Sequence, residues 1–162
     1  MKKILLDACF LIGLLDENSI HHQNSYDFFV RFCSDKDVVI KMSTIAVSEF
    51  SIRGDANLIP ANIQFLPFNC AHAIKAGEFG KVVSKCRKEA NDGSNRAIVL
   101  NDSKMFAQAE VEHFDCFVTT DSNASMAYGY LKTNGLANFE FVDVSKVSCC
   151  EYYGELNFNS YD

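Results

Sequence analysis

The chain has 162 residues, which is enough for one domain with a single hydrophobic core. Hydrophobic residues make up 48% and charged residues 22%, a balance that excludes a long disordered polypeptide. The formal net charge of −6 argues against a protein that coats nucleic acid through bulk electrostatics. It permits clustered carboxylates that are neutralised by bound cations.

The N-terminal segment resembles a secretory signal only in its first residues. Met1-Lys2-Lys3 is basic, but the apolar run from Ile4 to Leu15 contains Asp7 and lacks a small-residue cleavage pattern. No segment approaches the roughly 18 uninterrupted apolar residues that a membrane span requires. We therefore expect a cytoplasmic protein without a membrane span.

Seven cysteines occur in the chain, and none of them is spaced as C-x-x-C. This spacing excludes the usual zinc-ribbon and thioredoxin motifs. Without a secretory signal, we expect the thiols to be reduced. Cys9, Cys33 and Cys116 stand in apolar runs, which predicts that they are small core residues.

The first half of the chain alternates apolar strand patterns with helical patterns. Its first apolar run is of the kind found in buried parallel strands. In chain order, we expect a strand over 3–6, a helix over 8–15, a helix from Ser25 to Cys33, a strand over 38–40, and a helix that is capped by Ser43 or Thr44 and ends near Arg53.

The second half continues the alternation, with an extended segment that Pro67 places at a sheet edge or strand end. In chain order, we expect a loop over 54–60, the extended segment over 65–68, a helix from Asn69 or Cys70 to about Lys88, a loop over 91–95, a short apolar stretch over 97–100, a helix over 103–112, a strand over 116–119, a helix over 124–132 and a strand over 139–142.

This alternation predicts an α/β fold with three layers, α/β/α. Helices are expected on both faces of a central, mainly parallel sheet of four to five strands. We expect one domain over 1–144. Residues 145–162 then form a polar C-terminal extension, for which an extra strand and disorder both stay open.

Four acidic residues stand where ligands bind in open α/β sheets, beyond the carboxyl ends of the strands. Asp7 ends the first strand, and Asp121 follows a later strand. Glu49 lies on the helix after the second strand, and Asp102 opens the helix after the 97–100 stretch. We therefore expect all four side chains to converge on one edge of the sheet.

Such a cluster suits hard divalent cations. Mg²⁺ prefers carboxylate oxygens and water to thiols or imidazoles. Unpartnered carboxylates held close together would otherwise repel each other. One or two such ions can generate a hydroxide nucleophile and stabilise the leaving oxygen in phosphodiester cleavage.

Each acid also has a purely structural interpretation. Asp7, Asp102 and Asp121 precede helices, where Asp is a preferred N-cap. Glu49 has Arg53 four residues later, which allows a solvated ion pair. Taken singly, Glu49, Asp102 and Asp121 favour the structural interpretation. For Asp7, the structural and the functional interpretation are about equally supported. The combination of the four acids at matching strand ends favours a site.

The order and surroundings of the four acids resemble the PIN-domain family, and especially the toxin ribonucleases of the VapBC type. The opening ILLDACFLI at 4–12 is similar to the family's apolar strand followed by Asp. STIAVSEF at 43–50 resembles the second acidic motif, FLPF at 65–68 the middle segment, NDSKMFAQA at 101–109 the third motif, and FVTTDSN at 117–123 the fourth. The resemblance covers residues 3 to about 144.

The resemblance implies a PIN-like fold and an endoribonuclease that hydrolyses RNA by metal-activated water, with Mg²⁺ or Mn²⁺ as cofactor. It also implies the role of a toxin held by a small antitoxin, and a homodimer. Catalysis and metal binding, directly or through metal-bound water, are implied for four residues: Asp7, Glu49, Asp102 and Asp121. Supporting polar contacts are implied for Thr119 and Asn123.

Two basic residues flank the proposed acids, and two positions depart from the family pattern. Arg53 and Lys104 are expected to contact the substrate. Cys9 stands where many members have Ser, Thr or Asn, and Ala124 stands where an aromatic residue is common. These departures bear on the toxin role more than on the fold.

Other functions compete with the nuclease. A non-catalytic PIN module that binds RNA or a protein is the main alternative, and the presence of all four acids counts against it. A haloacid-dehalogenase-type phosphatase would need a second Asp two residues after Asp7, where Cys9 stands. A phosphoacceptor receiver domain would need paired acids at the first strand, and these are missing.

Overall fold

The computed structural model describes residues 1–90 and 96–154, and of residues 96–100 it describes only the backbone. In these residues, five parallel strands form one sheet in the order β3-β2-β1-β4-β5. This confirms the parallel sheet expected from the sequence, at the upper end of the expected strand number. The strands are β1 (Lys2–Leu6), β2 (Val38–Ser43), β3 (Gln64–Leu66), β4 (Cys116–Thr119) and β5 (Glu140–Asp143).

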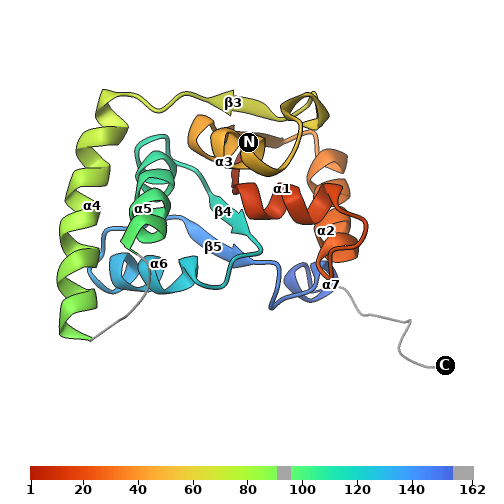
Figure 1. The fold of residues 1–162 in the computed structure, drawn as a ribbon. Helices are drawn as coiled ribbons and strands as arrows, with labels where there is room; N and C mark the ends of the chain where they lie inside the picture. Colours follow the sequence, from red (N-terminus) through yellow and green to blue (C-terminus); the bar gives the residue numbers. More distant parts are fainter. Residues whose placement is uncertain (91–95, 155–162) are drawn as a thin grey trace.

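Helices cover both faces of the sheet (Figure 1). The connections run from β1 outward to β3 in one direction, and from β4 to β5 in the other. Because such crossovers are right-handed, the two sets of helices lie on opposite faces. Helix α1 accordingly packs against α2 and α3, whereas α4 packs against α5 and α6. The helices are α1 (Ala8–Leu15), α2 (His22–Ser34), α3 (Thr44–Arg53), the 3₁₀ turn η1 (Ala56–Leu58), α4 (Cys70–Glu89), α5 (Arg96–Val111), α6 (Ala124–Thr133) and α7 (Cys149–Tyr152).

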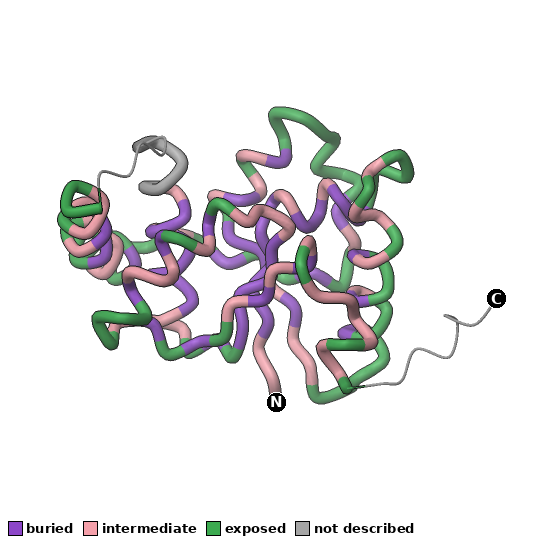
Figure 2. The backbone as a smooth tube through the Cα atoms, turned by 90° about the horizontal axis from the view of Figure 1, so that it is seen from below, coloured by how far each residue is buried: buried purple, intermediate pink, exposed green. Residues whose placement is uncertain are grey.

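The core lies along the central strands, where the chain is buried on both faces (Figure 2). Ile4, Leu5 and Leu6 of β1 are fully buried, and so is every residue of β4. A strand covered by helices on both sides needs an unbroken apolar run rather than an alternating one. This requirement explains why the apolar runs at 3–6 and 116–119 predicted these strands correctly.

The start of α5 corrects one expectation. The helix begins at Arg96, so residues 97–100 belong to it instead of forming a separate stretch. Asp102 therefore lies inside the helix and does not open it. A run of four apolar residues fits a strand and a buried helix equally well, which is why the sequence did not separate them. The loop expected at 91–95 lies outside the described residues.

The described part of the C-terminal extension packs onto α2. It contains α7, where a strand or disorder was expected. Asn24 of α2 donates through its side-chain amide to the carbonyls of Val144 and Val147, and its Oδ1 accepts from the Cys149 N–H. The ring of Tyr152 lies 5.6 Å from that of Phe28. Residues 155–162 lie outside the described residues.

The seven cysteines all lie in the described residues, and none of them forms a disulfide there. Cys116 is buried in the core, but Cys33 is exposed and Cys9 is only half-buried, which corrects the expectation for these two. The apolar neighbours of Cys33 point inward from an amphipathic helix, whereas its own position faces solvent.

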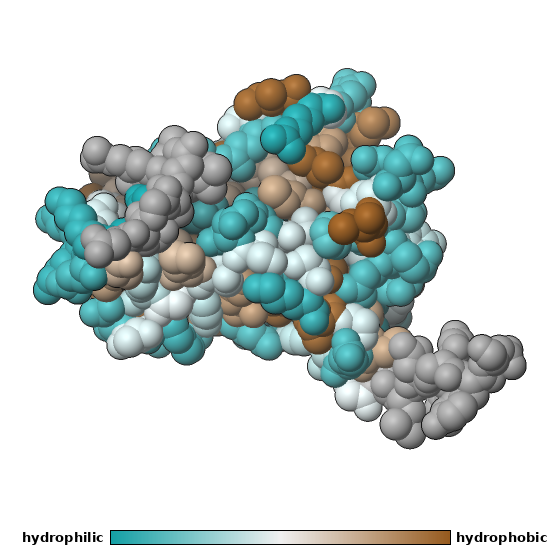
Figure 3. All heavy atoms as spheres, turned by 60° about the horizontal axis from the view of Figure 1, so that its bottom comes forward, coloured by the Kyte–Doolittle hydropathy of each residue, from teal (hydrophilic) through white to brown (hydrophobic). Residues whose placement is uncertain are grey.

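The surface is mostly polar on the face that Figure 3 shows, where the strongly hydrophobic residues stand among hydrophilic ones. Within the described part of the chain, no helix is both long enough and apolar enough to cross a membrane.

Candidate active site

A cavity of about 350 Å³ lies beyond the carboxyl ends of the two central strands. At β1 and β4 the chain turns toward opposite faces of the sheet, and this divergence leaves a crevice where α/β proteins bind ligands. Asp7 follows β1 directly, and Asp121 comes two residues after β4. The cavity is lined by Asp7, Ala8, Cys9, Ile12, Glu49, Ile52, Arg53, Asn101, Asp102 and Asp121.

Asp7 is held by two hydrogen bonds and is only 4% exposed. Its Oδ1 accepts from the Ala8 N–H at 2.7 Å, and its Oδ2 accepts from Thr119 Oγ1 at 2.6 Å. Asp7 thus does cap α1, as its structural interpretation required. The cap and the cavity are compatible, because a carboxylate offers about four lone-pair positions and these two bonds use only part of them.

Thr119 joins the two acids that follow the strands. Its buried hydroxyl donates to Asp7 and accepts from the backbone N–H of Asp121 at 2.9 Å. Asp121 Oδ1 in turn accepts from the backbone and the side-chain amide of Asn123, at 2.8 and 2.9 Å. Asp121 is therefore fixed by an Asx turn, and α6 begins only afterwards with Asn123 as its N-cap.

Glu49 reaches the cavity from the middle of α3. Its Oε1 accepts from Asn101 Nδ2 at 2.8 Å, and Asn101 Oδ1 accepts from Lys104 Nζ at 3.1 Å. Among the described residues, Glu49 forms no ion pair with Arg53, although both line the cavity. Lys104 lies behind Asn101 and does not line the cavity itself.

Asp102 enters the cavity from the second turn of α5 and is only 7% exposed. A position inside a helix excludes the N-cap interpretation. A buried carboxylate on a helix without a cationic partner in the described part of the chain is costly, which calls for a functional explanation.

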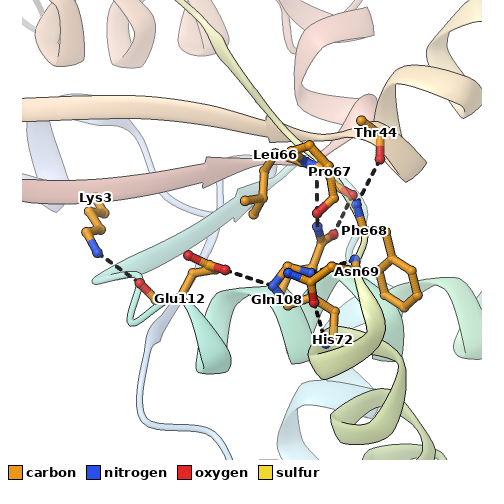
Figure 4. A network of polar contacts seen from close by, with 10 residues as sticks. Lys3, Thr44, Leu66, Pro67, Phe68, Asn69, His72, Gln108 and Glu112 are labelled. Carbon is orange, nitrogen blue, oxygen red and sulfur yellow. Dashed lines mark hydrogen bonds and ion pairs between the residues drawn. The ribbon is translucent and has the colours of Figure 1, made fainter.

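Helix α5 is tied to its surroundings by the buried amide of Gln108 (Figure 4). Gln108 Nε2 donates to the carbonyls of Leu66 and Pro67, at 3.3 and 3.4 Å, and Oε1 accepts from the hydroxyl of Ser43. Ser43 is the N-cap of α3. A single side chain thus connects the helix that carries Asp102 to the start of the helix that carries Glu49.

A second contact in the same network fixes the far end of α5 (Figure 4). Buried His72 of α4 bonds to Glu112 through Nε2 at 2.9 Å, and its Nδ1 accepts from the Asn69 N–H in a capping box. The contacts of Gln108 and of His72 together hold α5 between α4 and the sheet.

Asn101 and Gln108 were not singled out from the sequence. Gln108 carries a usable signal, because it is a polar residue inside the apolar run MFAQA, where an uncharged amide must find buried partners. Asn101 has no comparable signal, since its importance comes from a contact with Glu49, 52 residues away.

Burial and neighbouring charges shift the pKa values of two of the acids, Asp7 and Asp102. Burial is the main cause that raises the pKa of Asp7 to about 6, with the charges of Glu49 and Asp121 adding to the rise. The pKa of Asp102 is raised to about 8, mainly by burial and additionally by the charges of the other three acids. Burial raises the pKa of the Cys9 thiol to about 12. Without a metal ion, burial and like charges therefore disfavour the ionised forms of Asp7 and Asp102.

The donor set of the cavity fits a hard divalent cation. Its acidic groups are carboxylates, the ligands that Mg²⁺ and Mn²⁺ prefer. Among the described residues, no three His, Cys, Asp or Glu side chains are arranged so that they could hold a metal ion by themselves. Mg²⁺ keeps several of its waters in proteins, so carboxylates around an open cavity can bind it partly through water.

Three bacterial proteins are among the solved structures that share this fold. VapC20 of Mycobacterium tuberculosis, a toxin that cleaves the sarcin–ricin loop, aligns with a TM-score of 0.53 and 16% identity, over 76% of this chain and 94% of that chain. VapBC2 of Rickettsia felis, solved with a DNA fragment from its promoter, gives 0.56 and 14%, over 86% and 96%. FitAcB of Neisseria gonorrhoeae gives 0.59 and 16%, over 89% and 99%.

The chain has the PIN-like fold. No family sequence profile and no curated protein sequence matches it. At 14–16% identity, the likeness establishes the arrangement of helices and strands. Conclusions about chemistry must come from the side chains of this chain.

Proposed function

We propose that this protein is a metal-dependent endoribonuclease that hydrolyses RNA phosphodiester bonds with Mg²⁺ or Mn²⁺. One observation carries the proposal: four carboxylates from four separate segments line a single cavity at the switch point of the sheet. Two of them, Asp7 and Asp102, are buried there. Such an arrangement is unfavourable for stability unless a cation neutralises it, so a metal site explains why it is present.

Asp7, Glu49, Asp102 and Asp121 would hold the metal. When bound, a divalent ion activates water as the nucleophile and stabilises the leaving oxygen. Thr119 holds the carboxylate of Asp7 and the backbone N–H of Asp121, and Asn123 holds the carboxylate of Asp121.

The substrate contacts come from the rim of the cavity. Arg53 lines the cavity and offers its guanidinium to an RNA phosphate. Arg side chains bind phosphate through paired, charge-assisted hydrogen bonds. Lys104 is bonded to Asn101 instead, so its effect on RNA is indirect. We therefore expect substitution of Arg53 to weaken RNA binding more than substitution of Lys104 does.

The biological role that we propose is that of a toxin restrained by a small antitoxin, acting as a homodimer in the cytoplasm. The shared fold with VapC20, VapBC2 and FitAcB supports this role. Expression of the wild-type chain in a bacterial host should stop growth, and expression of Asp7→Asn at the same level should not. Equal growth of the two strains would contradict the toxin role without bearing on the chemistry.

The nuclease is tested with purified protein and a mixed RNA pool. After chelation of metal, RNA should stay intact, and addition of MgCl₂ or MnCl₂ should start its cleavage. Asp7→Asn should remain folded and inactive under all conditions, which excludes a contaminating nuclease. Cleavage that persists in the variant, or that needs no metal, contradicts the proposal.

A second candidate is a PIN-like module that binds RNA or a protein without cleaving it. The observation in its favour is that no three acidic, His or Cys side chains in the described residues are arranged to hold a metal ion by themselves. The same assay separates the two functions. RNA that binds with or without metal, and is recovered intact, supports the binding module.

A further inference from the structure

Glu49 is held differently from the other acids of the cavity. Asp7 and Asp121 accept hydrogen bonds from backbone N–H groups one or two residues along the chain. Glu49 has a longer side chain, and among the described residues its only hydrogen bond comes from Asn101, on another helix. Its orientation therefore depends on a tertiary contact.

The amide of Asn101 can adopt only one orientation between its two neighbours. The ammonium group of Lys104 can only donate, and the carboxylate of Glu49 can only accept. Asn101 must therefore turn its oxygen to Lys104 and its NH₂ group to Glu49, as the contacts at 3.1 and 2.8 Å show. Lys104 stands three residues after Asn101 on α5, so the two side chains share one helix face.

This arrangement keeps a cation near Glu49 without pairing the two charges. A direct ion pair with Lys104 would compete with a divalent cation for the carboxylate oxygens. A neutral amide fixes one oxygen of Glu49 and leaves the charge of the carboxylate uncompensated, and its second oxygen has no hydrogen-bond partner among the described residues. The residue itself lines the cavity.

A competing partner for Glu49 lies on its own helix. Arg53 stands four residues later on α3 and lines the same cavity. Glu followed by a basic residue at this spacing forms ion pairs on helices. The structure does not contain that pair among the described residues, although the spacing favours it.

We infer that Asn101, oriented by Lys104, is a positioning residue that holds Glu49 away from Arg53 and keeps its carboxylate available to the divalent cation. The inference rests on the proposed metal site. Without Asn101, Glu49 pairs with Arg53 and the affinity for metal falls.

The test measures binding of MnCl₂ alone, by titration calorimetry of the metal-free full chain without RNA. Groups that orient metal ligands typically change the affinity by about 10–100-fold when they are removed. We expect Asn101→Ala to weaken Mn²⁺ binding by about tenfold on this basis. Asn138→Ala is the matched control, because Asn138 also donates an amide to a carboxylate, Glu110, outside the cavity. It should bind Mn²⁺ like the wild type.

Two further variants separate positioning from general effects on the fold. Addition of Arg53→Gln to Asn101→Ala should restore most of the lost affinity, because the competing partner is then gone. Lys104→Met should weaken Mn²⁺ binding, and it should have no additional effect in the Asn101→Ala background. Bulk electrostatics predicts the opposite sign, since removal of a positive charge would favour a cation.

The melting temperature of each metal-free variant checks that it is folded, and Asn101→Leu replaces Asn101→Ala if the latter is unstable. Wild-type affinity in Asn101→Ala, no recovery with Arg53→Gln, or tighter binding by Lys104→Met would each overturn the inference while the metal site stands. A wild-type protein that binds no Mn²⁺ would overturn the inference together with the proposed function.

Discussion

The two halves of the candidate site are built in different ways. Asp7 and Asp121, which follow β1 and β4, are held by their own turns and by Thr119, all close to them in the chain or on the adjacent strand. Glu49 and Asp102 come from helices α3 and α5, whose relative position depends on contacts between distant segments. The strand half is therefore defined locally, and the helix half is defined by tertiary packing.

This difference predicts how each half responds to substitution. Local hydrogen bonds survive small movements of the helices, so the strand half should keep its geometry whenever the sheet is intact. The helix half should respond to any change that shifts α5 against α3. The following predictions test this contrast, from the largest expected effect to the smallest.

The largest effect is expected at the centre of the strand half. Asp7→Asn keeps the shape and removes the charge. Its oxygen can still accept from the Ala8 N–H, and its NH₂ group then faces the Thr119 hydroxyl as a donor. Loss of several kcal/mol of metal-ion stabilisation corresponds to a fall in the cleavage rate of about a thousandfold or more. The metal-free variant should melt at a higher temperature than the wild type at pH 8, because a buried charge is gone. Lower stability of the variant would show that Asp7 is structural.

The second effect is the dependence of metal-free stability on pH. The folded-state pKa values of Asp7, about 6, and Asp102, about 8, both lie above the ordinary value of 3.8 for an Asp side chain. The folded protein thus binds protons that the unfolded chain has lost, so stability is greatest below about pH 4 for these groups and falls as the pH rises through 6 and 8.

The pKa of Asp7 is about two units higher in the folded protein than in the unfolded chain. At roughly 1.4 kcal/mol per unit, the free energy of unfolding should fall by on the order of 3 kcal/mol as Asp7 ionises. Chemical denaturation of chelated protein between pH 4 and 9 measures this loss. Asp102→Asn should remove the part of the decline that lies between pH 6 and 8. A decline that is unchanged in Asp102→Asn would assign it to other groups. Saturating Mn²⁺ should flatten the curve of the wild type.

The third effect concerns the link between the two strand-end acids. Thr119→Val is nearly isosteric, but it removes the donor to Asp7 and the acceptor for the Asp121 N–H. Loss of these buried hydrogen bonds should destabilise the protein by about 1–3 kcal/mol. Thr119→Ser keeps the hydroxyl and serves as the control. If Thr119→Val and Thr119→Ser lose the same stability and the same cleavage rate, the methyl group matters and the hydroxyl does not.

The smallest effect is expected in the helix half. Gln108→Leu leaves the Leu66 carbonyl without its amide donor and removes the acceptor of the Ser43 hydroxyl. The loss in stability should be about 1–2 kcal/mol. If α5 then shifts against α3, Mn²⁺ affinity falls as well. The variant Ser51→Ala removes an exposed hydroxyl whose bond stays within α3, and it should keep the affinity. Unchanged affinity in Gln108→Leu would show that the helix half is more robust than the contacts suggest.

The same contrast explains what the sequence could predict. The strands of the core and the span of α1 follow from local patterns, and these expectations were correct. Of the two caps expected for α3, Ser43 or Thr44, the structure uses Ser43. The start of α5 was wrong because the 97–100 run has no local feature that separates a strand from a buried helix.

The site divides along the same line. Placement of Asp7 and Asp121 at one cavity follows from strand ends and the topology of a parallel sheet, whereas Asp102 reaches the cavity from inside α5 and not from its expected start. The partners of Glu49 could not be predicted, because Arg53 at helical spacing was the visible candidate and Asn101 is the residue that the fold supplies. The metal, the RNA substrate and the antitoxin stay predictions.

The most direct test of the metal site is anomalous diffraction from a crystal of the protein soaked in MnCl₂. The account predicts a manganese peak inside the cavity, between the carboxylates of Asp7, Glu49, Asp102 and Asp121, bound directly at about 2.0–2.2 Å or through water. The peak should disappear in Asp7→Asn. A fully soaked crystal with no peak in the cavity, or with manganese bound only elsewhere on the chain, would contradict it.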